Sequence, residues 1–237
     1  MNKSISNNNG SNKKFWLLIA LLIGPLVFYL LILTGENKFR PLPILHKNVM
    51  DIASLEPQQN IQFKDKISIV CFFGEDLLQH KTNALNLNEK IYKRFNGFEQ
   101  FQFVVLLPNG TEQKANQLKN ELAFNTNVNN WKFVFTTKEN LSTIFKSLKT
   151  DLSLDEKQYI AQAFIIDKDF SLRGRNKDED YDNGLLYGYD AETVSQIHQK
   201  MVDDVKILLA EYRLALKKNK KKEVFKNPYK KTQKVIG

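Results

Sequence analysis

The sequence predicts an α/β domain, a mixed sheet flanked by helices, preceded by one transmembrane helix. Residues 15–34 form an uninterrupted run of 20 uncharged residues. From residue 66 onward, short apolar runs typical of strands alternate with longer segments of helical periodicity. The chain has a single cysteine, Cys71, so no disulfide can form within it.

The apolar run at residues 15–34 is long enough to cross a membrane. At about 1.5 Å per residue it spans a hydrocarbon core of roughly 30 Å. The residues that follow it, Leu33 to Glu36, lack the small-residue cleavage site of a signal peptide, and a buried core helix of this length would contain polar breaks. We therefore expect an uncleaved anchor after a short tail at residues 1–14.

The charges that flank this anchor are equal in number on its two sides. Three basic residues precede it and three follow it, namely Lys3, Lys13 and Lys14, and Lys38, Arg40 and Lys47. Lys13 and Lys14 stand directly beside the apolar run, and the free amino terminus adds a positive charge. We expect the tail to be cytoplasmic and the C-terminal domain to lie outside, which in a bacterium means an inner-membrane anchor and a periplasmic domain.

The formal net charge of +9 is concentrated at the C-terminus. Residues 217–237 contain nine lysines and one acid, Glu223, so this segment carries +8 and the rest of the chain only +1. A lysine run with few apolar residues cannot bury enough surface to fold, which predicts a disordered tail. We expect the tail to be solvated or to contact anionic lipid or an acidic protein. We expect no nucleic-acid partner, because the body lacks a basic patch.

Apolar runs predict five strands. The first, residues 66–73, is closed by Gly74. The second is too continuously apolar for a half-exposed strand, so we expect it to be parallel and covered on both faces. The last two are separated by a short turn and predict an antiparallel hairpin. After the first strand, the predicted strands are residues 101–107, 131–135, 163–167 and 171–175.

Helical patterns separate these strands. The first predicted helix, residues 75–95, has acids at its start and an apolar face formed by Leu77, Ala84, Leu87, Ile91 and Phe95. Shorter helices are predicted at residues 111–123 and 140–148. Asp190 is expected to cap a long final helix. The apolar stripe of that helix is Val194, Ile197, Met201, Val205, Leu208 and Tyr212.

This order of elements is thioredoxin-like with one inserted element. We expect a single domain at residues 63–216, joined to the anchor by a linker at residues 35–62. Three segments also resemble the Sco/SenC proteins: residues 70–74, residues 162–169 with Arg173 and Gly174 after them, and residues 204–212. The resemblance implies a membrane-anchored relative of copper chaperones and thiol reductases that serve cytochrome oxidase assembly.

The chain departs from that family where its chemistry resides. The family carries a C-x-x-x-C pair shortly after the first strand, and Leu78 and Thr82 stand at those positions. Neither side chain can hold Cu(I) or exchange a disulfide. The family's copper-binding histidine is also missing, because Tyr159, Ile160 and Ala161 occupy its neighbourhood. We therefore expect no catalytic residue, no bound metal and no cofactor.

Other residues offer weak substitutes for the missing site. Cys71 lies in an apolar strand with no adjacent cation, which is typical of a buried structural thiol. His80 is near the position of the family's cysteines but has no further ligand at metal-binding spacing. The run Asp178 to Gly184 fails the EF-hand pattern, because Asn183 stands at the sixth position and Tyr189 at the twelfth. We expect a solvated acidic loop there, with a weakly bound divalent ion as the alternative.

These observations predict a catalytically inactive binding or scaffolding module at the bacterial envelope. We expect an envelope protein partner to dock where the first helix begins, at Gly74, Glu75 and Asp76, and at the neighbouring approach through Tyr159 and Gln162. A second candidate surface is the loop at residues 176–189, which contains Asp180 and Tyr181. The alternatives are an accessory of copper handling or oxidase assembly that uses His80 and methionines, and a thiol oxidoreductase that pairs Cys71 with an external thiol.

Overall fold

The computed structural model describes residues 9–34 and 40–226, and the chain divides into two units, Met1–Arg40 and Pro41–Gly237. The first unit contains helix α1 (Asn9–Thr34). Its segment Lys13–Ile32 is long and apolar enough to cross a membrane, as the sequence predicts, and is the one such helix in the described part of the chain. Residues 1–8 and 35–39, which hold most of the predicted cytoplasmic tail and the start of the predicted linker, lie outside the described residues.

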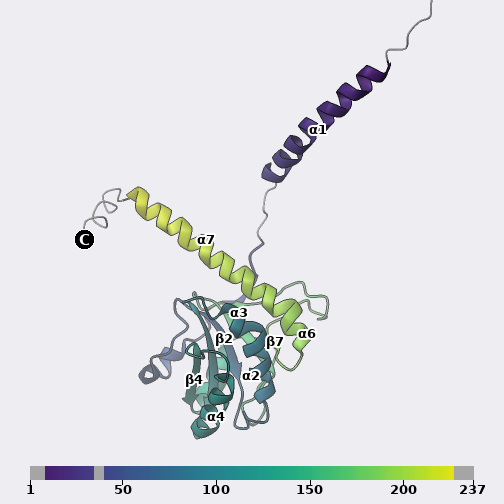
Figure 1. Ribbon diagram of the computed structural model, residues 1–237. Coiled ribbons are helices and arrows are strands. Elements are labelled where there is room, and N and C mark those ends of the chain that lie inside the picture. The colour runs from purple at the N-terminus through teal and green to yellow at the C-terminus, as the bar shows by residue number, and fades with distance from the viewer. Residues whose placement is uncertain (1–8, 35–39, 227–237) are drawn as a thin grey trace, which may run out of the picture. The chain divides into compact units, whose positions relative to one another are not determined.

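The second unit is built on one seven-stranded mixed sheet (Figure 1). Strands β2, β3 and β4 are parallel, β5 pairs antiparallel with β2, and β6 pairs antiparallel with β5. The path across the sheet is β1-β6-β5-β2-β3-β4, and β7 pairs with β5. The strands are β1 (Ile44–His46), β2 (Ile67–Phe72), β3 (Phe101–Pro108), β4 (Trp131–Thr136), β5 (Gln162–Ile166), β6 (Leu172–Arg173) and β7 (Tyr189–Asp190).

Helices connect the strands and cover both faces of the sheet. Two of them contain a π-helical stretch, η3 and η4. Short 3-10 turns, η1 (Ile52–Ser54) and η2 (Pro57–Gln59), precede β2. The helical segments after β2 are α2 (Lys81–Leu87), η3 (Asn88–Tyr92), α3 (Lys93–Phe95), α4 (Glu112–Leu122), α5 (Lys138–Ser147), α6 (Val194–Gln196), η4 (Ile197–Met201) and α7 (Val202–Lys226).

The alternation of side chains along β2 creates two hydrophobic cores. Ile69 and Cys71 point into a core shared with α2, α4 and α7, whereas Val70 and Phe72 point into a core shared with α5. Every residue of β2 and of β3 is buried, which confirms the expectation that the predicted strand at residues 101–107 is covered on both faces. A parallel βαβ core extended by an antiparallel hairpin is the thioredoxin-like arrangement that the sequence predicts.

The domain begins earlier than predicted. Residues from Pro41 onward belong to the folded unit, so the expected linker at residues 35–62 is wrong from Pro41 onward. Strand β1 pairs with β6, and Leu42, Val49 and Ile52 are buried. The backbone N–H of Leu42 donates to Glu211 Oε1 at 2.6 Å, and Glu211 also pairs with the buried Arg173. A carboxylate on α7 therefore fixes the start of the domain.

Three predicted helix boundaries also differ. The first helix begins at Lys81 instead of residue 75, because residues 75–80 form turns. Asp190 belongs to β7 and does not cap the final helix; Thr193 precedes that helix, and Val194 is exposed. Helix α7 continues to Lys226, so residues 217–226 are helical and not disordered as predicted. The rest of the predicted tail, residues 227–237, lies outside the described residues.

Replacing Glu211 with alanine should loosen the start of the domain. The change leaves the Leu42 N–H without its acceptor and leaves Arg173, whose side chain is only 8% exposed, with Asp167 as its one carboxylate. Removing one partner of such a pair costs about 2–3 kcal/mol. Urea denaturation of Glu211→Ala should show that loss, and amide exchange should accelerate at residues 42–46. An exposed control, Lys206→Ala, should change neither measurement.

Candidate functional site

The predicted docking residues lie at the carboxyl end of β2. Gly74 has a φ of 65° there, and a Cβ at this position would stand 2.6 Å from the carbonyl oxygen of Lys157. The N–H of Glu75 donates to that same carbonyl at 2.9 Å, and Phe73 forms a β-bridge with Tyr159. Glycine is required because only it allows both the left-handed backbone and this close approach. The structure thus brings Gly74, Glu75 and Tyr159 together, although Gly74 and Tyr159 are 85 positions apart in the sequence.

The two positions at which the Sco/SenC resemblance would place cysteines hold no reactive group. Leu78 is half-buried against the hydrophobic core, and Thr82 is exposed on α2. The one thiol, Cys71, is 1% exposed near the carboxyl end of β2, and burial raises its pKa far above the usual range of a thiol. A thiol in this environment stays protonated and out of reach of solvent.

Lysines from three different segments neutralise the acids of this rim. Asp76 pairs with Lys157 at 2.6 Å and with Lys114 at 3.7 Å, and Glu75 pairs with Lys138 at 2.6 Å. The hydrogen bond from Lys157 and the charges of Lys157 and Lys114 lower the pKa of Asp76. The rim therefore presents matched charges and no free carboxylate at Glu75 or Asp76.

Tyr159 is held on both its ring and its hydroxyl. Its ring stacks on His80 with centroids 3.5 Å apart and an interplanar angle of 11°. Its hydroxyl donates to Glu192 at 2.7 Å and accepts from the amide of the buried Asn83 at 2.9 Å. Burial, together with the hydrogen bond to Glu192, raises the pKa of Tyr159, so the hydroxyl stays protonated at neutral pH. Sequence reasoning did not identify Asn83 and Glu192 as part of this site.

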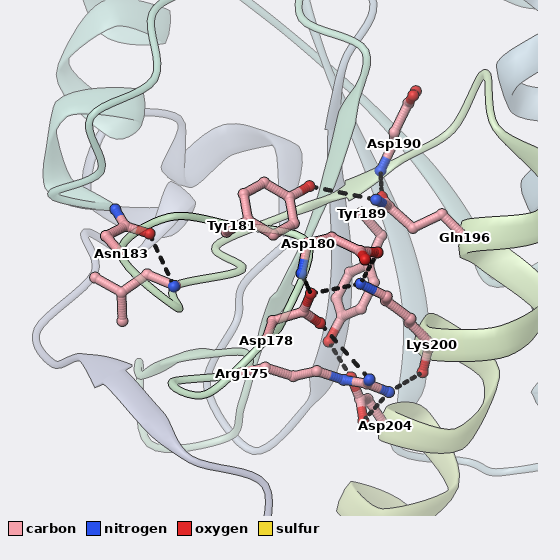
Figure 2. A network of polar contacts seen from close by, with 11 residues as sticks. Arg175, Asp178, Asp180, Tyr181, Asn183, Tyr189, Asp190, Gln196, Lys200 and Asp204 are labelled. Carbon is pink, nitrogen blue, oxygen red and sulfur yellow. Dashed lines mark hydrogen bonds and ion pairs between the residues drawn. The ribbon is translucent and has the colours of Figure 1, made fainter.

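The loop at residues 176–189, the second predicted surface, is attached to the final helix (Figure 2). Asp178 has a side chain only 2% exposed; it accepts from Lys200 at 2.5 Å and lies 3.7 Å from Arg175. Lys200 also pairs with Asp180 at 2.6 Å. The expectation of a solvated acidic loop is therefore wrong for Asp178. Residues on η4 and before the loop supply the positive charges that neutralise the acids.

A second part of the same network lies beneath the loop, as Figure 2 shows. Arg175 forms a forked pair with Asp204, with Nε 2.7 Å from one carboxylate oxygen and a terminal nitrogen 3.1 Å from the other. The hydroxyl of the buried Tyr189 donates to Asp204 at 2.7 Å. The carboxylate of Asp204 thus fixes both ends of the loop, because Arg175 precedes it and Tyr189 closes it.

A cavity joins the two predicted surfaces. Gln162, from the first surface, and Tyr181, from the second, both line a cavity of 220 Å³, together with Asp151, Asn183 and Tyr187. The hydroxyl of Tyr181 accepts from Gln196 at 3.3 Å. This volume is smaller than that of drug-sized pockets, so the cavity suits a single side chain or another small group.

The three histidines occupy separate places. His46 stacks on Tyr187, His80 stacks on Tyr159, and His198 is exposed on η4. Within residues 9–34 and 40–226, no three His, Cys, Asp or Glu side chains are grouped so that they could hold a metal ion.

Comparisons with known proteins give fold-level likeness only. No protein-family model and no curated protein sequence matches the chain. A proposed electron transfer protein from Aquifex aeolicus VF5 is 15% identical, with a TM-score of 0.42, over 62% of this chain and 86% of its own. A proposed protein disulfide isomerase from Bacteroides thetaiotaomicron is 9% identical, with a TM-score of 0.42, over 73% and 89%. At these scores the likeness says nothing about the chemistry of this chain.

The loop at residues 176–189 should loosen in acid. Burial alone would raise the pKa of Asp178, but the hydrogen bonds from Lys200 and the Asp180 N–H, with the charges of Lys200 and Arg175, outweigh it and lower the pKa. A depressed folded-state pKa means that the stabilisation is complete above about pH 4, the unfolded value, and is lost as the pH falls through the folded value. Amide exchange, corrected for its intrinsic pH dependence, should show the loop losing protection below pH 4. Lys200→Met should weaken that protection already at pH 7. Equal protection of the two proteins at pH 7 would contradict the assignment.

Proposed function

We propose that this chain is a membrane-anchored, thioredoxin-like module that binds a partner protein and performs no thiol chemistry. The proposal rests on the residues that are found where such thiol chemistry would take place. Leu78 and Thr82 stand at the two cysteine positions implied by the Sco/SenC resemblance, and the single thiol of the chain is buried inside β2. A fold that keeps its architecture without a nucleophile or a soft metal ligand at that position can still act through its shape and charge.

The anchor is part of this proposal. Helix α1 is long and apolar enough to cross a bilayer, and lysines flank its amino end. The folded unit begins at Pro41, a few residues after α1 ends at Thr34. We propose a bacterial inner membrane and a periplasmic domain, which makes an envelope protein the natural partner.

The docking surface proposed first is the rim at the carboxyl end of β2. Gly74, Glu75 and Asp76 are held by the backbone of Lys157 and by three lysine side chains, and Tyr159 is held by stacking and by two hydrogen bonds. A surface whose side chains are already fixed loses little conformational entropy on binding. Gln162 and Tyr181 extend it into the 220 Å³ cavity, which would receive one side chain of the partner.

Cys71 should be inert in the native protein. Its burial and raised pKa predict that a thiol reagent labels it only after unfolding, so native labelling by Ellman's reagent at pH 8 should be at least about 100-fold slower than in guanidinium. The isolated protein should also fail to reduce insulin in the presence of dithiothreitol above the uncatalysed rate. Thr82→Cys supplies an exposed thiol as a matched control and should label rapidly. Fast native labelling of Cys71, or insulin turnover, would refute the proposal.

The rim should crosslink to a partner. A photoreactive benzoyl-phenylalanine at Gln79, an exposed residue beside the rim, is expected to give one discrete adduct in membranes of the cells that express the protein. The same group at Lys146, exposed on α5, is the control and should not give that adduct. Asp76→Ala, which removes the carboxylate that pairs with Lys157 and Lys114, should weaken the Gln79 adduct. The same adduct from both positions, or none from Gln79, would count against docking at this rim.

A further inference from the structure

The outer edge of the sheet at β4 has unpaired backbone groups. Strand β4 pairs with β3 on one side only, because it ends the strand order. The carbonyls of Asn130 and Thr136 accept from the N–H groups of Phe103 and Asn109 at 2.8 and 2.9 Å. Pairing in a parallel ladder alternates along the strand, so even-numbered residues of β4 bond to β3 and odd-numbered ones face outward.

The outward-facing groups can be accounted for one residue at a time. Trp131 donates its N–H to the carbonyl of Val128 at 3.0 Å. At Phe135, the side chain of Gln59 accepts from the N–H at 3.1 Å and donates to the carbonyl at 2.5 Å. Between them, the N–H and C=O of Phe133 have no partner among the described residues. The Gln59 carboxamide thus binds Phe135 as the peptide group of a neighbouring strand would. The backbone N–H and C=O of Phe133, the neighbouring outward-facing residue, remain available for pairing.

A groove runs beside the unpaired backbone groups of Phe133. A cavity of 490 Å³ is lined by Trp131, Phe133 and Phe135 of β4, by Ala115 and Lys119 of α4, and by Ile61. The rings of Phe133 and Phe135 are half-buried and pack against the hydrophobic core. An added strand would therefore find apolar contacts for alternate side chains next to the open backbone groups.

The charges at the groove are positive and lack acidic partners. Lys119 lines the groove and has no ion pair among the described residues. Lys132 also lines it, and its ammonium group donates to the carbonyl of Asn129 at 2.7 Å but has no carboxylate partner in that part of the chain. Charge complementarity therefore favours an acidic occupant.

We propose that the edge of β4 at Phe133 binds an extended, acidic segment of a partner protein by strand addition. The inference rests on the proposed function as a binding module and gives the module a second contact surface. A second copy of this chain fits less well. Two β4 edges paired at Phe133 would place Lys132 of each copy near the other, and Gln59 already occupies Phe135 in both.

The test uses the full chain in nanodiscs of neutral phospholipid. The probe is a fluorescein-labelled, acetylated heptapeptide of alternating valine and threonine with a glutamate at each end, and fluorescence anisotropy measures its affinity. Binding should slow hydrogen exchange at the Phe133 amide and leave the rim around Gly74 unchanged. A peptide with glutamine in place of both glutamates should bind more weakly, and reversal of Lys119 and Lys132 to glutamate should weaken binding of the acidic peptide.

Two substitutions on the edge separate strand addition from simple apolar contact. Phe133→Pro and Phe133→Ala both remove the ring, but only proline removes the N–H, and an edge strand tolerates proline where its N–H faces outward. Proline should therefore weaken binding about fivefold more than alanine, the value of one hydrogen bond. Gln59→Ala frees the N–H and C=O of Phe135 and should tighten binding about fivefold. Urea denaturation checks that each variant is folded.

Three results would overturn binding of the peptide by strand addition. These are equal affinity of the proline and alanine variants, weaker binding by Gln59→Ala, and absence of exchange protection at Phe133. Self-association of the chain that Phe133→Pro abolishes would assign the edge to a second copy and would equally refute an acidic partner segment. None of these outcomes depends on the reactivity of Cys71 or on the crosslink at Gln79, which test the proposed function. Failure here is therefore distinguishable from failure of the proposed function.

Discussion

The burial of β2 and β3 on both faces is the constraint on which the rest of the structure depends. Side chains of β2 alternate between two hydrophobic cores, so every position along it must be apolar or have its polar group satisfied. Ser68 meets that condition through the amide of Gln102 at 2.9 Å. Cys71 meets it as a small apolar side chain. The chain first becomes free of this constraint just after Gly74, at Glu75, where the polar side chains of the rim begin, so the limit of the core also determines where the candidate site can lie.

Ion pairs outside the core determine which surfaces have a fixed shape. Asp178 and Asp204 are buried carboxylates, each satisfied by a cation and by further hydrogen bonds, and together they hold the loop at residues 176–189 against η4 and α7. Breaking such a pair costs more than forming it gains, because a buried charge would lose its partner. The loop is therefore a fixed wall of the cavity that also contains Gln162, and a partner would meet it already ordered.

The sequence predicts β2, β3, β4 and β5 to within a residue, because continuous apolar runs such as residues 101–107 are typical of a covered sheet, whereas the strand predicted at residues 171–175 is only Leu172–Arg173. It misses the start of the domain, where Leu42, Val49 and Ile52 are too widely spaced to show a period. The sequence places Tyr159 and Gly74 at one site because its order of strands and helices resembles the thioredoxin-like fold. It cannot find Glu192 or Asn83, since their hydrogen bonds to Tyr159 join distant segments and leave no local pattern.

The edge at β4 illustrates the same limit and extends the argument about the role of the fold. Gln59 and Phe135 are 76 residues apart, and only the folded chain shows that a side-chain amide closes part of an exposed strand. Proteins commonly protect such edges against unwanted pairing, and the two lysines beside Phe133 are one of the usual means. Lysines that repel a second basic edge also attract an acidic strand. If the edge binds as proposed, the charge that opposes self-association would also select the partner, and a domain without a reactive thiol could be specific in this way.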